Sequence, residues 1–279
     1  MFFREEKGGE SIESFKYCFL NSLTGVHPII NQSGIWSRRA KVYDNLEWVR
    51  KKKFLDFFIE QCNPQEDFIA LDIGSGTGIV TRELAKRVKK VIGIDLSKDM
   101  IIEAIKKDDC ENLNVEPMYV QMDAQEMGFL DCTFDLITAR MVFHHIENVK
   151  KGLKEVYRVL KRGGKFVLCE GVPPDYKVRK RYEEIFALKE KRHTFSEAEL
   201  INLFYWMGFK NITLKPFFME QVSLVNWLKN SAVESEVAER ILELHLNADE
   251  YFKKVYRMTV SDEDIFIDWK FVVVIGEKK

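Results

Sequence analysis

The chain has 279 residues, of which 46% are hydrophobic and 31% charged, and its formal net charge is −1 at pH 7. This composition is that of an ordinary globular protein with a sizeable core, and it excludes wholesale disorder. The balanced charge argues against a nucleic-acid backbone or an anionic membrane as the main partner.

The middle of the chain alternates short apolar runs with amphipathic segments, a pattern typical of a parallel sheet with crossover helices. A rather aromatic N-terminal segment and a predicted helix at 46–61 come first. Five strands are then predicted at 68–72, 91–95, 118–121, 134–139 and 166–170. Helical spacing predicts the connections at 80–88, 97–105 and 149–160.

Beyond Gly171 the pattern changes to a helix at 195–207 that ends at Gly208, followed by strands at 212–218 and 271–275. The residues between these strands have helical periodicity, and they are far too many for a hairpin loop. We therefore predict four parts: an N-terminal lid segment 1–44, an α/β domain 45–218, a helical substrate lid 219–268 and the last strand 269–279. Ligands of open parallel sheets bind at the carboxyl ends of the strands, where both lid segments are expected. The alternative is that the insertion only covers sheet edges.

A glycine-rich turn, Leu71-Asp-Ile-Gly-Ser-Gly-Thr-Gly78, lies where the first strand ends and a helix begins. Glycines let the backbone turn sharply there and let a ligand approach closely. The dinucleotide fingerprint has the spacing GxGxxG and faces a pyrophosphate. Here the glycines alternate and Asp72 precedes them by two positions, which favours a ligand with an ammonium group over one with a phosphate. S-adenosylmethionine has an ammonium, a sulfonium and no phosphate.

Two further aspartates follow the next two strands. Asp95 ends the second strand, where a carboxylate can accept hydrogen bonds from both ribose hydroxyls. Asp123 ends the third strand, and with Ala124 it can face the polar edge of an adenine. A lone aspartate at a strand end is more often a cap or turn former, but three at successive strand ends favour a ligand site.

These motifs, together with the segment from Phe134 to His145 and Leu160-Lys-Arg-Gly-Gly164, resemble those of class I S-adenosylmethionine methyltransferases. Within that superfamily the chain resembles the ubiquinone/menaquinone-biosynthesis C-methyltransferases and their small-molecule relatives. The resemblance covers roughly residues 43–170. It implies a doubly wound, Rossmann-like, mostly parallel sheet of seven strands with a final antiparallel strand. It also implies S-adenosylmethionine as cofactor and S-adenosylhomocysteine as product.

The cofactor-binding residues that this resemblance implies are Asp72, Gly74, Ser75, Gly76, Gly78, Asp95, Leu96, Met100, Asp123, Ala124, Ala139 and Arg140. The glycines would line the methionine and ribose moieties, and the apolar pair after Asp95 would flank the adenine. The insertion at 219–268 is longer than expected for the group, so the group's acceptor does not carry over.

Methyl transfer from a sulfonium is an in-line displacement that some acceptors assist by losing a proton to a base. His144 is the predicted catalytic base, because it follows the fourth strand and imidazole titrates near neutral pH. Tyr43, His145 and His193 are the predicted substrate-binding residues. Packing roles for the histidines and for Tyr43 stay open. Arg140 could bind a substrate carboxylate or phosphate, or form a salt bridge within the pocket.

The sequence therefore predicts methyl transfer to a small-molecule acceptor. An NAD-dependent oxidoreductase, a non-catalytic S-adenosylmethionine-binding protein and an RNA methyltransferase are the alternatives. Five cysteines without CxxC spacing favour a cytoplasmic protein with reduced thiols, and neither a signal peptide nor a membrane span is expected. No metal is expected from the His and Cys spacing. A monomer or a homodimer fits the sequence equally well.

Overall fold

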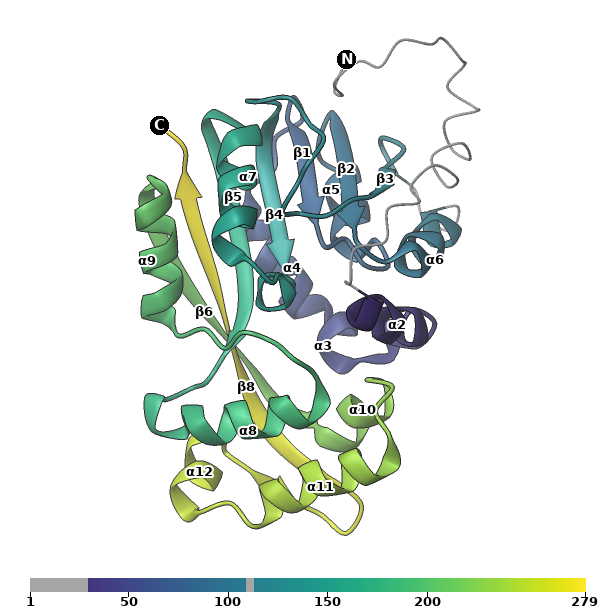
Figure 1. The fold of residues 1–279 in the computed structure, drawn as a ribbon, viewed down its shortest axis with the longest axis vertical. Coiled ribbons are helices and arrows are strands. Elements are labelled where there is room, and N and C mark those ends of the chain that lie inside the picture. Colours follow the sequence, from purple (N-terminus) through teal and green to yellow (C-terminus); the bar gives the residue numbers. More distant parts are fainter. Residues whose placement is uncertain (1–29, 109–112) are drawn as a thin grey trace.

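The computed structural model describes residues 30–108 and 113–279. Most of the predicted N-terminal lid segment 1–44 therefore lies outside the described residues. The described part is elongated, with a sheet and its covering helices at one end and a group of small helices at the other (Figure 1).

The sheet is built from strands β1 to β8, in the order β3-β2-β1-β4-β5-β8-β6 with β7 beside β8. The five parallel strands are β1 (Ile69–Ile73), β2 (Lys90–Asp95), β3 (Met118–Gln121), β4 (Phe134–Arg140) and β5 (Leu160–Val172). β8 (Ile265–Glu277) runs antiparallel to both β5 and β6 (Lys210–Ser223). The predicted α/β class and antiparallel last strand are confirmed. The two-residue β7 (Thr259–Val260) is an addition to the seven predicted strands.

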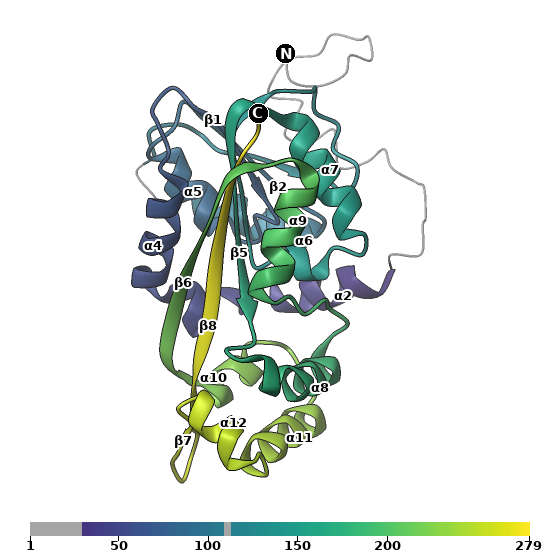
Figure 2. The same cartoon turned by 90° about the vertical axis from the view of Figure 1, so that its left-hand side faces the viewer.

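Helices cover both faces of the sheet, which is why its central strands are apolar on both sides. Helices α4 (Lys52–Cys62) and α5 (Ile79–Ala85) lie on one face, and α7 (Val149–Val159) and α9 (Glu197–Met207) on the other (Figure 2). Phe54 and Leu84 are completely buried on the first face, as are Phe143 and Phe204 on the second. α6 (Lys98–Asp108) joins β2 to β3, and α9 ends as predicted at Gly208 in a left-handed conformation.

The predicted helix at 46–61 is interrupted. Lys51 has extended backbone angles and separates α3 (Glu47–Arg50) from α4. The break allows α3 to bury Trp48 and Val49 while α4 packs on the sheet along its own apolar face. Tertiary burial outweighs the continuous helical periodicity at this point.

The small helices lie beyond the carboxyl ends of the parallel strands (Figure 1). They are α10 (Leu224–Lys229), α11 (Ser235–Leu246) and α12 (Glu250–Val255), joined there by α8 (Arg179–Lys189). The sequence analysis missed α8, because six of its eleven residues are charged and mask its periodicity. The strands β6 and β8 are both longer than predicted and extend to these helices. The helical part of the insertion therefore begins only at Leu224.

An N-terminal segment, α2 (Ile30–Arg39) and the short 3-10 helix η1 (Tyr43–Asn45), also lies at this edge of the sheet (Figure 1). Contacts of η1 reach the glycine turn, as described below. Within residues 30–108 and 113–279, no helix combines the length and the apolar character needed to span a membrane.

Candidate functional site

The glycine turn after β1 has the backbone that its sequence predicts. Gly74, Gly76 and Gly78 have φ angles of +64°, +53° and +83°, a region that side chains with a Cβ avoid. A Cβ on Gly74 would also lie 2.3 Å from the Val142 side chain. The amide of Ser75 donates to the carbonyl of Ile94 over 2.9 Å. The turn is therefore fixed against the ends of β2 and β4, and only glycine fits at its first position.

Asp72 lies beneath this turn and is buried. Its two carboxylate oxygens accept hydrogen bonds from the hydroxyls of Thr81, at 2.7 Å, and Thr138, at 2.9 Å. Burial raises the pKa of Asp72 to about 6, although these two hydrogen bonds oppose the shift. Asp72 thereby ties β1 to α5 and β4. Its predicted place near the methionine end of the cofactor stays a prediction.

The raised pKa of Asp72 predicts a pH-dependent stability that Asp72→Asn removes. Because burial favours the protonated carboxyl, the stabilising contribution is present at low pH and is lost as pH rises through about 6. Between pH 5 and pH 8 this loss is about 1 kcal/mol of unfolding free energy. Urea unfolding at both pH values should show a smaller loss in Asp72→Asn than in the parent chain. Asp56→Asn, on the surface of α4, should leave the difference unchanged; an unchanged difference in Asp72→Asn would contradict the assignment.

Asp95, at the end of β2, faces the glycine turn. One carboxylate oxygen accepts from the amide of Gly76 at 2.9 Å and the other from the amide of Ser97 at 2.8 Å. Burial raises the pKa of Asp95. A carboxylate offers about four acceptor positions, so these two bonds leave capacity for ribose hydroxyls. Beside it, the apolar side chain of Leu96 is 37% exposed, while Met100 is buried.

Asp123 is engaged within its own turn. One oxygen accepts from the Gln125 amide nitrogen at 2.8 Å, and both oxygens lie 3.2 Å from the Gln125 side-chain nitrogen. The turn-forming role that the sequence left open for Asp123 is therefore present. Its role toward an adenine, and that of the half-buried Ala124, stay predictions.

Two buried side-chain atoms in the described part of the chain lack a hydrogen-bond partner: Ser75 Oγ in the glycine turn and Arg140 Nη1 at the end of β4. The Arg140 guanidinium lies 5.6 Å from the ring centres of both Trp48 and Phe54. Burial lowers the pKa of Arg140. A buried donor without a partner costs about 1–3 kcal/mol, which a ligand carboxylate would recover. These donors, the glycine turn and Asp95 together suit the carboxylate and ribose of S-adenosylmethionine, so the residues fit this cofactor.

The η1 segment covers the glycine turn. The Asp44 carboxylate accepts a hydrogen bond from the Thr77 hydroxyl at 2.5 Å, and it forms an ion pair with Lys107 of α6. Tyr43 lies close enough that a Cβ on Gly76 would be 3.8 Å from its ring. Tyr43 thus lies beside the glycine turn, and it also lines an adjoining pocket.

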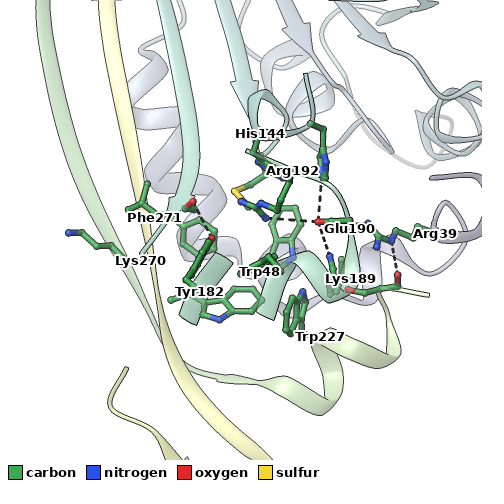
Figure 3. Close-up of a pocket in the computed structure, with 18 of the residues that line it drawn as sticks. Arg39, Trp48, His144, Tyr182, Lys189, Glu190, Arg192, Trp227, Lys270 and Phe271 are labelled. Atoms are coloured by element: carbon green, nitrogen blue, oxygen red, sulfur yellow. Dashed lines mark hydrogen bonds and ion pairs between the residues drawn. The ribbon is translucent and has the colours of Figure 1, made fainter. Parts of the chain in front are cut away.

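This adjoining pocket, called the aromatic pocket below, lies between the strand ends and the small helices (Figure 3). Its walls are mainly the rings of Trp36, Trp48, Tyr182, Phe186, Trp227 and Trp269. Tyr43, His144 and His145 line it as well, so three of the predicted catalytic and substrate-binding residues meet here.

His144 is paired with a residue that the sequence analysis missed. Its Nδ1 lies 2.5 Å from the carboxylate of Glu170, which is completely buried at the end of β5 and also accepts from the Phe143 amide at 2.7 Å. Burial raises the pKa of Glu170 to about 7 and holds the pKa of His144 well below its usual value. A neutral His144 that donates Nδ1–H to Glu170 keeps Nε2 as a proton acceptor. A glutamate at the end of the otherwise apolar predicted strand 166–170 was the available signal.

His193 does not line the aromatic pocket, and its predicted role in substrate binding stays a prediction. Its ring is exposed, lies 3.3 Å from the Glu147 carbonyl and lines a separate shallow hollow with Phe195. The preceding residue, Arg192, lines the aromatic pocket instead. The His193 amide donates to the His144 carbonyl. The neighbouring side chains of Arg192 and His193 therefore line different pockets.

Comparison with known proteins agrees with this geometry. Residues 71–168 match the family model of the methyltransferase domain. The chain is 24% identical over 253 residues to the uncharacterized methyltransferase YcgJ of Bacillus subtilis, covering 88% of this chain and 98% of YcgJ. It is 32% identical over 148 residues to the ubiquinone/menaquinone biosynthesis C-methyltransferase UbiE of Rickettsia typhi, covering 50% of this chain and 59% of UbiE.

Solved structures show the same fold. The crystal structure of YcgJ superposes with a TM-score of 0.72 at 23% identity, covering 81% of this chain and 97% of YcgJ. Phosphoethanolamine N-methyltransferase 2 of Haemonchus contortus, in complex with S-adenosyl-L-methionine, gives 0.57 at 17% identity, covering 86% and 57% of the two chains.

The sheet, the glycine turn and the matched domain define a class I methyltransferase. The chain carries a methyltransferase domain at residues 71–168, and the proteins to which it is similar include quinone C-methyltransferases. Its cofactor is S-adenosylmethionine, and the sequence prediction of this cofactor is confirmed.

Proposed function

We propose that the chain methylates a small molecule bound in the aromatic pocket, with His144 as the base that receives the acceptor's proton. The observation that carries this proposal is the position of Tyr43. It lies beside the glycine turn and also lines the pocket of His144. The cofactor and acceptor sites therefore adjoin, as an in-line displacement requires.

In this mechanism the protein mainly positions the two reactants. S-adenosylmethionine supplies the electrophilic methyl group when bound. Arg140 and Ser75 would hold its carboxylate and Asp95 its ribose, with Leu96 and Met100 against the adenine. His144 Nε2 would accept the acceptor's proton while Glu170 stabilises the imidazolium that forms. The aromatic walls would exclude water.

Label transfer tests the class of acceptor. The purified enzyme, with S-adenosylmethionine that carries a tritiated methyl group, is incubated separately with a metabolite ultrafiltrate, total RNA and dialysed cell protein. Label should enter the ultrafiltrate, because the aromatic pocket lies between the strand ends and the small helices and is lined by side chains of both. Preferential labelling of RNA or protein would overturn the small-molecule proposal.

Asp95→Ala should weaken the binding of S-adenosylhomocysteine by about 1.5–3 kcal/mol, the contribution of hydrogen bonds to a charged group. Isothermal titration calorimetry measures this loss, with Asp56→Ala on the exposed side of α4 as the matched control. Unchanged affinity in Asp95→Ala would remove this residue from the cofactor site. Titration with NAD tests the oxidoreductase alternative in the same instrument, and no binding is expected.

The remaining partner proposals follow from composition. We propose a cytoplasmic enzyme without a nucleic-acid partner, as a monomer or a homodimer. The net charge of −1 supports the absence of a nucleic-acid partner. Cys62, Cys132 and Cys169 are free thiols, which supports a reducing compartment.

A further inference from the structure

The aromatic pocket holds an excess of buried positive charge. Arg39, Lys189 and Arg192 have side chains that are only 4%, 7% and 5% exposed, and all three converge on the single carboxylate of Glu190 (Figure 3). Their ion pairs with Glu190 span 2.7, 3.1 and 4.0 Å. In the described part of the chain, one negative charge thus faces three positive ones at this point. Even with Glu170 behind His144 fully ionised, a positive charge remains in excess.

Burying an unpaired charge is costly, so this excess favours an anionic ligand. Burial lowers the pKa of Lys189 to about 8 even though Glu190 opposes the shift, as expected where cations outnumber carboxylates. Burial likewise lowers the pKa of His144 and His145, so both imidazole rings are neutral and do not change the charge of the pocket. A bound anion would restore the balance of charge in the pocket.

Arg192 has the most unused capacity among the three cations. Arg39 is well satisfied, with bonds of 2.6 Å to the Ser231 carbonyl and 2.7 Å to Glu190. Arg192, by contrast, makes within residues 30–108 and 113–279 only a 3.4 Å polar contact to the His193 carbonyl besides its 4.0 Å contact with Glu190. Its guanidinium lies 4.4 Å from the ring centre of Phe186. A planar fork held on a ring can bind a carboxylate or phosphate through two parallel hydrogen bonds.

Two cationic occupants are disfavoured by the same charges. His144, His145 and Glu190 have ligand atoms within 4.8 Å of one another, a grouping that could hold a metal ion. The three cations around Glu190 would repel a divalent ion. An acceptor with a quaternary ammonium group would meet the same repulsion. Aromatic rings that could bind such an ammonium group already contact cationic side chains of this chain. The ammonium of Lys189, for example, lies 5.3 Å from the ring centre of Trp227.

We propose that the methyl acceptor is an aromatic or similarly flat apolar acid, whose carboxylate or phosphate binds Arg192 and Lys189 while its apolar body lies among the rings of the aromatic pocket. This inference rests on the proposed function. It deepens that function by naming the chemical class of the acceptor. Because Glu190 orients all three cations, it is a positioning residue for this anion site.

The test compares ligands that differ in charge. Benzoate, phenyl phosphate, benzamide and benzyltrimethylammonium are titrated into the enzyme saturated with S-adenosylhomocysteine, and quenching of the pocket tryptophans reports binding. Benzoate or phenyl phosphate should bind at least about tenfold more tightly than benzamide, because charge-assisted hydrogen bonds contribute at this scale. Whichever acid binds more tightly distinguishes a carboxylate acceptor from a phosphate acceptor.

Arg192→Met should abolish the preference for the acid. Arg181→Met, a matched change at a half-buried arginine on α8 that does not line the pocket, should retain it. Arg192→Gln serves as a second variant if Arg192→Met does not fold. Equal binding of acid and amide, tighter binding of the ammonium compound, or no binding of either acid at millimolar concentration would overturn the inference. The affinity of the parent chain for S-adenosylhomocysteine is measured in parallel. If the parent chain does not bind S-adenosylhomocysteine, the proposed function is refuted. If it binds S-adenosylhomocysteine but neither acid, only this inference is refuted.

Discussion

Replacing His144 by alanine is expected to lower kcat by about 10²–10⁴-fold, the range typical of a lost general base. The affinity for S-adenosylhomocysteine should stay unchanged, because His144 lines the aromatic pocket and the cofactor residues lie at the glycine turn. Tritium transfer to the labelled fraction of the ultrafiltrate measures turnover, and calorimetry measures affinity. The matched control is His145→Ala, which removes the neighbouring ring that packs on Trp36 at 4.9 Å. This control should lose less turnover than His144→Ala.

The pH profile separates a base from a packing residue. Since burial raises the pKa of Glu170 to about 7, its ionised form is lost as pH falls through that value, and kcat should fall with it. Glu170→Gln keeps the shape of the side chain but cannot ionise. Its kcat should be lower than that of the parent at pH 8 and should vary little between pH 6 and pH 8. Normal turnover in His144→Ala would assign both residues to packing alone.

Gly74→Ala is expected to reduce the affinity for S-adenosylhomocysteine more than tenfold and to destabilise the fold. A left-handed backbone costs about 1–2 kcal/mol for a residue with a Cβ. At Gly74 the added atom would also lie 2.3 Å from Val142, so the turn itself must move. Calorimetry and urea unfolding measure the two effects.

Gly163 provides a matched control for this prediction. Its φ is +76°, but a Cβ there would have no atom within 4 Å. Gly163→Ala should therefore show the backbone cost in stability with normal cofactor affinity. The double variant Gly74→Ala with Val142→Gly should recover part of the affinity, since it removes the contacting Val142 atoms but not the backbone cost. Equal behaviour of Gly74→Ala and Gly163→Ala would contradict the steric explanation.

The cofactor half of the fold could be predicted because its signals are local. A strand, a glycine turn and a helix follow one another within residues 69–85, and the family resemblance then implies the sheet order. The Glu170–His144 pair could not be predicted in this way. The two residues are 26 positions apart and meet only because β4 and β5 are neighbours, with Arg140 opposite Cys169.

The far ends of β6 and β8 were missed for a different reason. β6 is an edge strand with many exposed residues, an internal Pro216 and two shifts of register along β8, so it lacks a clear alternation of apolar and polar residues. Proline is tolerated at an edge, where the missing N–H faces outward. The charge excess around Glu190 was equally hidden, because Arg39 comes from a different part of the chain than Lys189 and Arg192.

The continuity of β6 and β8 has a consequence for how ligands enter. These two strands run without a break from the central sheet to the small helices, and they pair along most of their length. A hydrogen-bonded ribbon of this kind is expected to be rigid. That wall of the active site should therefore keep its shape through the catalytic cycle. Any movement that admits ligands is then expected in α2 and η1 on the opposite side. The ion pair of Arg39 with Glu190 and the hydrogen bond of Asp44 with Thr77 hold this segment closed. Movement of α2 and η1 away from the sheet would expose the glycine turn and the aromatic pocket together, so the two products would leave through the same opening.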